Sequence, residues 1–151
     1  MLSQEGKQRV ERRIRILIAD DRPATRSGLK ALLTLFAQVE VVGEAANGQE
    51  SVDLVAEHKP DVVLMDMQMP VMDGLEATRR IKQQWPEVRV IALTIYTKYR
   101  AQAFAAGADA FLLKDGAPDK LADAILTEVS GAQGHADTLA QHVARGTQPD
   151  H

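Results

Sequence analysis

The sequence predicts an α/β domain in which helices cover both faces of a parallel sheet. From residue 14 to residue 130, short apolar runs alternate with stretches of helical periodicity. Several of the apolar runs are nearly continuous in Val, Ile, Leu and Ala, which is typical of strands buried on both faces. Right-handed crossovers between parallel strands give a doubly wound sheet, and we expect the flavodoxin-like strand order 2-1-3-4-5.

Five segments are expected to form the strands of this sheet. They are short and apolar, and four of them lead directly into a polar side chain. The expected strands are residues 14–19, 39–45, 61–66, 88–93 and 109–113.

Spacing and capping signals predict the first three helices. The second and third begin with Asn47 and Asp73, each three residues before a glutamate, which resembles a capping box. The third helix is expected to end before Pro86. In the first helix, apolar residues recur at i, i+3, i+4 and i+7, which places them on one helical face. These residues are Leu29, Leu32, Leu33 and Phe36.

Glycine and proline delimit the last two helices. The fourth, at about 98–106, is alanine-rich and is expected to stop at Gly107. The fifth starts near Pro118, because proline is favoured at the first helical position, and ends by Gly131.

Polar segments flank the expected domain, which comprises residues 14–130. Residues 1–13 are polar and locally basic, as in a solvated tail. Residues 131–151 begin like a linker and continue with a weak amphipathic pattern. That pattern fits a frayed tail, or a short helix that docks on a partner or on a second copy. The segment is too short for a helix-turn-helix domain, which needs three helices.

Composition narrows the classes of function. The 151 residues fit one domain with tails, and the absence of cysteine excludes disulfides and thiolate zinc sites. The formal net charge of −3 disfavours general nucleic-acid binding. The N-terminus lacks the apolar core of a signal peptide, and no apolar stretch approaches the ~20 residues that span a bilayer. We therefore expect a cytoplasmic protein without membrane or direct nucleic-acid contacts.

Chemically capable side chains stand at the ends of four expected strands. The carboxyl ends of parallel strands meet at one edge of an open sheet, where such folds bind ligands. Three carboxylates there repel one another unless a cation intervenes, and oxygen ligands beside a phosphoryl group favour Mg²⁺. Together these side chains predict a site for a divalent cation and a phosphoryl group. The residues are Asp20 and Asp21 after the first strand, Asp66 at the third, Thr94 at the fourth and Lys114 at the fifth.

With these residues in this order, the chain resembles the receiver domain of a response regulator of two-component signalling. The resemblance covers about residues 14–130 and extends to the segments around the five site residues. The Leu-Leu-Lys-Asp sequence at 112–115 and the helix start at 26–29 resemble the branch that usually precedes a LuxR-type DNA-binding domain. The matching segments are residues 20–23, 65–74, 92–94 and 106–115.

The resemblance implies a role for each residue of the site. Asp66 is the implied phosphoacceptor, and a phosphohistidine on a sensor histidine kinase, or a phosphotransfer protein, is the implied donor. Asp21, Asp66 and the Met67 backbone carbonyl are implied to bind Mg²⁺ directly, whereas Asp20 acts through water. Lys114 is implied to pair with a phosphoryl oxygen, and with Asp66 before phosphorylation.

The resemblance also implies a two-state switch. Thr94 would hydrogen-bond the phosphoryl group, and the ring of Phe111 would rotate into the space that opens. An ordinary core position is an equally weighted alternative for Phe111, because a phenylalanine in the fifth strand is apolar in either case. The output would be altered contacts, with a partner or in a homodimer, on the face of the fourth helix, fifth strand and fifth helix. This face includes Lys98, Tyr99, Arg100, Gln102, Ala103 and Phe104.

We therefore expect a bacterial regulatory protein rather than an enzyme, either a stand-alone receiver or part of a transcriptional regulator. Gln68 and Ile95 flank the implied phosphoryl position, and the branched Ile95 predicts slow self-dephosphorylation because it hinders an attacking water. A phosphatase of the haloacid dehalogenase type would need an aspartate in place of Gln68. A flavodoxin-like redox carrier would need a phosphate-binding loop where Asp20 and Asp21 stand. A receiver-shaped binding module that acts without phosphorylation is the remaining alternative.

Overall fold

A computed structural model describes residues 12–116 and 118–130 of the protein. Five parallel strands form one sheet in the order β2-β1-β3-β4-β5, which confirms the predicted topology. The expected strand bounds differ from the observed ones by at most one residue. The strands are β1 (Ile14–Ala19), β2 (Val39–Ala45), β3 (Val62–Met65), β4 (Arg89–Thr94) and β5 (Ala110–Leu113).

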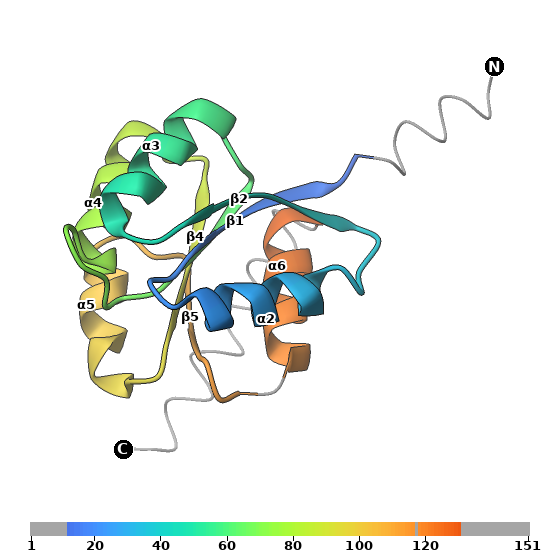
Figure 1. Ribbon diagram of the computed structural model, residues 1–151. Helices are drawn as coiled ribbons and strands as arrows, with labels where there is room; N and C mark the ends of the chain where they lie inside the picture. Colours follow the sequence, from blue (N-terminus) through green and yellow to red (C-terminus); the bar gives the residue numbers. More distant parts are fainter. Residues whose placement is uncertain (1–11, 117, 131–151) are drawn as a thin grey trace.

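Helices cover both faces of this sheet (Figure 1). α3, α4 and α5 pack on one face, and α2 and α6 pack on the other. Within the described ranges, no helix has the length and apolar character that crossing a bilayer demands. The helices are α2 (Pro23–Leu33), α3 (Gly48–His58), α4 (Gly74–Gln84), the 3₁₀ helix η1 (Thr97–Tyr99), α5 (Arg100–Ala105) and α6 (Pro118–Ser130).

Two helix starts follow the capping signals in the sequence. The Asn47 side chain accepts a hydrogen bond from the Glu50 amide at 2.8 Å, and Asp73 accepts one from Glu76 at 2.9 Å. Each cap satisfies one of the free amides in the first turn of its helix. The caps fix where α3 and α4 begin, and α4 begins directly after the loop that follows β3.

One helix prediction was wrong in its limit, and another helix differs from expectation in the type of its first turn. α2 ends at Leu33, so Phe36 does not belong to the helix, although its side chain still packs on the core below α2. The Thr34 hydroxyl donates to the Ala31 carbonyl at 2.7 Å, and such a bond competes with helix continuation. The expected fourth helix starts with η1, because the Tyr99 amide bonds three residues back to Tyr96 rather than four.

Each face of the sheet has its own apolar core. The side chains of β1 alternate between them: Leu17 packs toward α3 and α4, whereas Ile16 and Ile18 pack toward α2 and α6. All three side chains are fully buried. Burial on both faces holds the strands rigidly, so their carboxyl ends form a fixed platform for the side chains that follow. The predictions for residues 1–11 and 131–151 lie outside the described residues.

Candidate functional site

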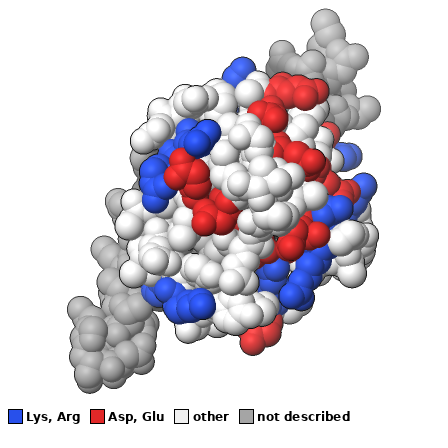
Figure 2. All heavy atoms as spheres, turned by 60° about the vertical axis from the view of Figure 1, so that its left-hand side comes forward, with Lys and Arg blue, Asp and Glu red and all other residues white. Residues whose placement is uncertain are grey.

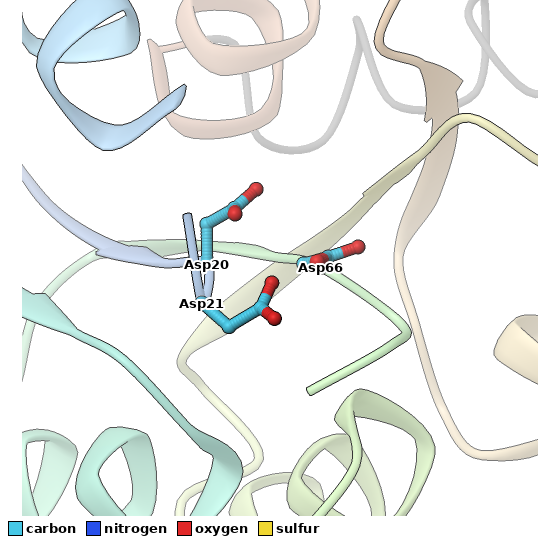
Figure 3. Close-up of side chains that lie close together, drawn as sticks. All are labelled: Asp20, Asp21 and Asp66. Atoms are coloured by element: carbon cyan, nitrogen blue, oxygen red, sulfur yellow. The ribbon is translucent and has the colours of Figure 1, made fainter. Parts of the chain in front are cut away.

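Three carboxylates lie together at the carboxyl ends of β1 and β3. These strands are neighbours, and Ala19 pairs with Met65, so the residues that follow both strands are adjacent. One carboxylate oxygen from each of Asp20, Asp21 and Asp66 lies within 4.8 Å of the other two. Figure 3 shows the three side chains projecting into the same space. The sheet register therefore brings together acidic residues that are far apart in the chain.

Asp20 is bonded through all of its polar groups. Its amide donates to the Ala45 carbonyl at 2.9 Å, and its own carbonyl accepts from the Arg26 guanidinium at 2.6 Å. One carboxylate oxygen accepts from the Arg22 amide at 2.8 Å, and the other lies 2.6 Å from the Lys114 ammonium. Asp20 is 1% exposed, so these bonds replace the water that it loses on folding. Asp20 is therefore the fixed member of the cluster.

Lys114 joins the cluster from the end of β5. Its amide donates to the Thr94 carbonyl at 2.8 Å, which ties the ends of β5 and β4 together. Its ammonium lies 2.6 Å from Asp20 and 3.5 Å from Asp66, as the expected pairing with Asp66 requires. The shorter contact with Asp20 was not predicted from the sequence.

The cluster holds more negative charge than Lys114 offsets. Burial raises the pKa of Asp66 above its ordinary value; the Lys114 charge opposes this rise and the Asp20 charge adds to it. A raised pKa shows that the pocket disfavours the ionised carboxylate, although Lys114 is close. A second cation beside Lys114 would offset the remaining negative charge of the three carboxylates.

The donor set fits a hard divalent cation. Its members are carboxylate oxygens, of which the exposed Asp21 gives access from solvent. The Met67 carbonyl accepts one hydrogen bond, from the Gly74 amide at 3.0 Å, and a carbonyl oxygen has a second lone pair. Met67 also lines the hollow beside Asp21. An all-oxygen donor set of this kind suits Mg²⁺.

The two residues of the expected switch lie on neighbouring strands. Thr94 ends β4 and is buried, and its hydroxyl accepts from the Tyr96 amide at 3.3 Å. Phe111 pairs with Ala92 across the β4–β5 ladder, two residues before Thr94 on that strand. The Phe111 ring is half-buried against the core on the α5 side, and the Arg100 guanidinium lies 5.8 Å from its centroid. This position is compatible with a switch residue and with a core residue.

Two further residues touch the site, and no pattern in the sequence placed them there. Arg26 bonds the Asp20 carbonyl and also pairs with Glu44 at 3.2 Å. Tyr99 accepts a hydrogen bond from the Gln68 side chain at 2.8 Å. Arg26 belongs to a stretch that resembles other receivers, and Tyr99 lies on the expected output face. Neither signal indicates a contact with the site.

Comparison with known proteins gives one family. The model of the response regulator receiver domain matches residues 16–126. The uncharacterized transcriptional regulatory protein YhcZ of Bacillus subtilis is 44% identical over 110 residues, which is 72% of this chain and 51% of that protein. The chain spans about half the length of the curated relatives that it matches.

Solved structures share the fold. A LuxR-family two-component response regulator from Aurantimonas sp. SI85-9A1 superposes with a TM-score of 0.76 and 33% identity, over 89% of this chain and 97% of that one. A chain of the CheX-CheY-BeF3-Mg+2 complex from Borrelia burgdorferi gives a TM-score of 0.70 and 25% identity, over 76% of this chain and 88% of that one.

Proposed function

The chain belongs to the response regulator receiver domain family, and from that membership we propose that Asp66 accepts a phosphoryl group with the help of Mg²⁺. The observation that carries the proposal is the meeting of Asp20, Asp21, Asp66 and Lys114 at one edge of the sheet. The CheX-CheY-BeF3-Mg+2 complex of Borrelia burgdorferi, which shares the fold, is consistent with the proposal.

The transfer itself is a displacement at phosphorus. An Asp66 carboxylate oxygen forms a bond to phosphorus while the phosphorus–nitrogen bond of a donor phosphohistidine breaks. The leaving imidazole keeps the electron pair and takes up a proton. Asp21, Asp66 and the Met67 carbonyl would hold Mg²⁺ directly and Asp20 would hold it through water; the ion offsets charge on the phosphoryl oxygens when it is bound.

Lys114 and Thr94 respond to the new group. The Lys114 ammonium exchanges its contact with Asp66 for a phosphoryl oxygen, because the phosphoryl group carries more charge than the carboxylate it replaces. The bond from the Tyr96 amide to the Thr94 hydroxyl is long, so little is lost when Thr94 turns to donate to the phosphoryl group. The Thr94 loop and Phe111 then form the two-state element of the switch.

The partners of this reaction follow from its chemistry. The donor is a sensor histidine kinase or a phosphotransfer protein. The output is a change in the contacts that the face of α5, β5 and α6 makes with a partner or with a second copy of the chain. Figure 2 brings forward the side on which α3, α4 and α5 lie, where acidic and basic side chains are interspersed with uncharged surface. A mixed surface of this kind favours a protein partner over a phosphodiester backbone. We place this regulatory, non-enzymatic role in the bacterial cytoplasm.

Incubation with acetyl phosphate and Mg²⁺, followed by intact-mass measurement, tests the proposal. The native protein should gain one phosphoryl group, and Asp66→Ala should gain none. EDTA should abolish the gain for the native protein. If the native protein gains no mass, a binding module that acts without phosphorylation becomes the better description. If Asp66→Ala is labelled equally, a residue other than Asp66 accepts the phosphoryl group and the assignment of Asp66 is wrong.

A further inference from the structure

A hydrogen bond joins the two loops that carry the phosphoacceptor and the switch hydroxyl. The Gln68 side-chain amide donates to the Tyr99 hydroxyl at 2.8 Å. Gln68 lies two residues after Asp66, and Tyr99 lies five residues after Thr94, at the end of η1. Both residues line the hollow beside Asp21, at the open side of the acidic cluster. The bond therefore connects the loops after β3 and β4 beside the exposed member of the acidic cluster.

Tyr99 is firmly held on its own side of this bond. Its ring packs edge to face with Tyr96, with 6.2 Å between the centroids. The Lys98 ammonium lies 5.3 Å from the Tyr96 centroid and 5.4 Å from the Tyr99 centroid. The Tyr99 ring also packs against the buried core on the α5 side of the sheet. These contacts join Tyr96, Lys98 and Tyr99 into one packed unit.

The same unit holds the Thr94 hydroxyl. The Tyr96 amide donates to Thr94 at 3.3 Å, so a chain of contacts runs from Gln68 through Tyr99 and Tyr96 to Thr94. Tyr96 and η1 follow Thr94 directly in the chain, so movement of the loop after β4 toward Asp66 would carry Tyr99 with it and separate Tyr99 from Gln68. A contact that exists in only one of two states shifts the equilibrium toward that state.

We propose that Tyr99 is a positioning residue whose bond to Gln68 holds the Thr94 loop in its resting place and thereby slows phosphorylation of Asp66. The inference rests on the proposed function, and it adds a restraint built into the resting site. The bond is neutral and solvent-exposed, and a single bond of this kind changes an equilibrium or a rate by roughly two- to tenfold.

Tyr99→Phe tests the restraint, because it removes the hydroxyl and keeps the ring in its place. Tyr96→Phe is the matched control: it removes a hydroxyl from the other ring of the pair and keeps the amide that bonds Thr94. The reaction is labelling of Asp66 by acetyl phosphate and Mg²⁺, in which the oxygen–phosphorus bond to acetate breaks and acetate leaves. Intact mass against time gives the rate.

Tyr99→Phe should be labelled about two- to tenfold faster than the native protein, and Tyr96→Phe at the native rate. In a Gln68→Ala background, Tyr99→Phe should have no further effect, because the bond is already lost. The affinity for Mg²⁺, measured by calorimetry, should be unchanged by Tyr99→Phe. A rate for Tyr99→Phe that equals or falls below that of Tyr96→Phe overturns the inference, as does full additivity with Gln68→Ala.

Hydrogen exchange separates this inference from the proposed function. In metal-free, unphosphorylated protein, amides of residues 95–100 should exchange faster in Tyr99→Phe than in the native chain or in Tyr96→Phe. Unchanged exchange overturns the restraint, whatever the labelling shows. If no variant is labelled, including the native protein, the proposed function is overturned, and with it any effect on phosphorylation. Faster exchange in Tyr99→Phe would still establish the Gln68 contact as a restraint on η1.

Discussion

The Lys114 ammonium lies 2.6 Å from the Asp20 carboxylate, closer than the 3.5 Å that separates it from Asp66. Lys114 thus offsets mainly the charge of the buried Asp20 and leaves Asp66 less firmly paired. A weakly paired carboxylate is the better nucleophile, because fewer strong bonds must be released when it attacks. The same arrangement makes Lys114 a competitor of Mg²⁺ for the acidic cluster.

Lys114→Met separates these two effects. Without the ammonium, the cluster should bind Mg²⁺ more tightly, by about three- to tenfold, because a competing cation is gone. Phosphorylation of Asp66 should nevertheless slow by at least about tenfold, since the ammonium that meets the phosphoryl oxygen is lost. Calorimetric titration of Mg²⁺ and the rate of labelling by acetyl phosphate measure the two quantities.

The exposed Lys59 provides the control for this experiment, because it lies before β3, at the opposite end of that strand from Asp66, and Lys59→Met removes an equal charge there. It should leave the affinity for Mg²⁺ and the labelling rate at their native values. Weaker Mg²⁺ binding by Lys114→Met would contradict the competition between Lys114 and the metal.

Asp66→Asn should stabilise the metal-free protein at neutral pH. Burial raises the pKa of Asp66, so the folded state binds its proton more tightly than the unfolded state does. This contribution to stability is fully present below the unfolded pKa and is lost as the pH rises through the folded pKa. At neutral pH the ionised side chain opposes folding, and its neutral amide analogue does not. The midpoint of thermal unfolding in EDTA should therefore be higher for Asp66→Asn.

Asp73→Asn is the matched control for this substitution, because asparagine caps α4 as well as aspartate does. Its unfolding midpoint should stay near the native value. Addition of Mg²⁺ should raise the midpoint of the native protein more than that of Asp66→Asn. A lower midpoint for Asp66→Asn in EDTA would show that the pairing of Asp66 with Lys114 outweighs the cost of its burial.

Much of this architecture could be predicted because the relevant signals are local. Nearly continuous apolar runs identify buried strands, and parallel strands bring their carboxyl ends to one edge of the sheet. That rule alone is enough to bring Asp21, Asp66 and Lys114 to the same end of the sheet. Phe36 shows where a local signal fails: its spacing continues the helical pattern, but it packs half-buried on the core from a turn beyond the end of α2.

Contacts between long side chains were not predictable, because they depend on rotamers and on loops that the sheet topology does not fix. The Gln68–Tyr99 bond joins residues 31 positions apart. The Lys82 ammonium bonds the Val88 carbonyl at 2.9 Å and Asp109 at 3.0 Å, and nothing in their spacing predicts either contact. The sequence therefore predicts which groups meet at the site, but not how they are paired.

Arg26→Met should destabilise the fold, because it removes the donor to the carbonyl of the buried Asp20. The expected loss is about 1–2 kcal/mol in the free energy of unfolding, measured by urea denaturation. Lys30→Met is the control: Lys30 pairs with the same Glu44, at 3.4 Å, and is half-exposed. Its loss should stay within about 0.5 kcal/mol. Equal losses would mean that Arg26 acts through Glu44 and not through Asp20.

Gly74→Ala should damage the fold and the site together. A Cβ at Gly74 would lie 1.9 Å from the Asp66 carbonyl oxygen and 2.8 Å from the Met67 Cα. Both are backbone atoms at the start of the loop after β3, so the strain cannot be relieved by a side-chain rotation. We expect a loss of at least about 2 kcal/mol in the free energy of unfolding and a fall in labelling of Asp66, because that loop shifts. At Gly28 in α2, no described atom lies within 4 Å of the same test position apart from the chain neighbours of Gly28 and the backbone of its own helix. Gly28→Ala should therefore stabilise the fold by about 0.5–1 kcal/mol. Urea denaturation of the two variants measures both changes in the free energy of unfolding. If Gly74→Ala is as stable as Gly28→Ala, the loop that follows Asp66 is free to move away from α4.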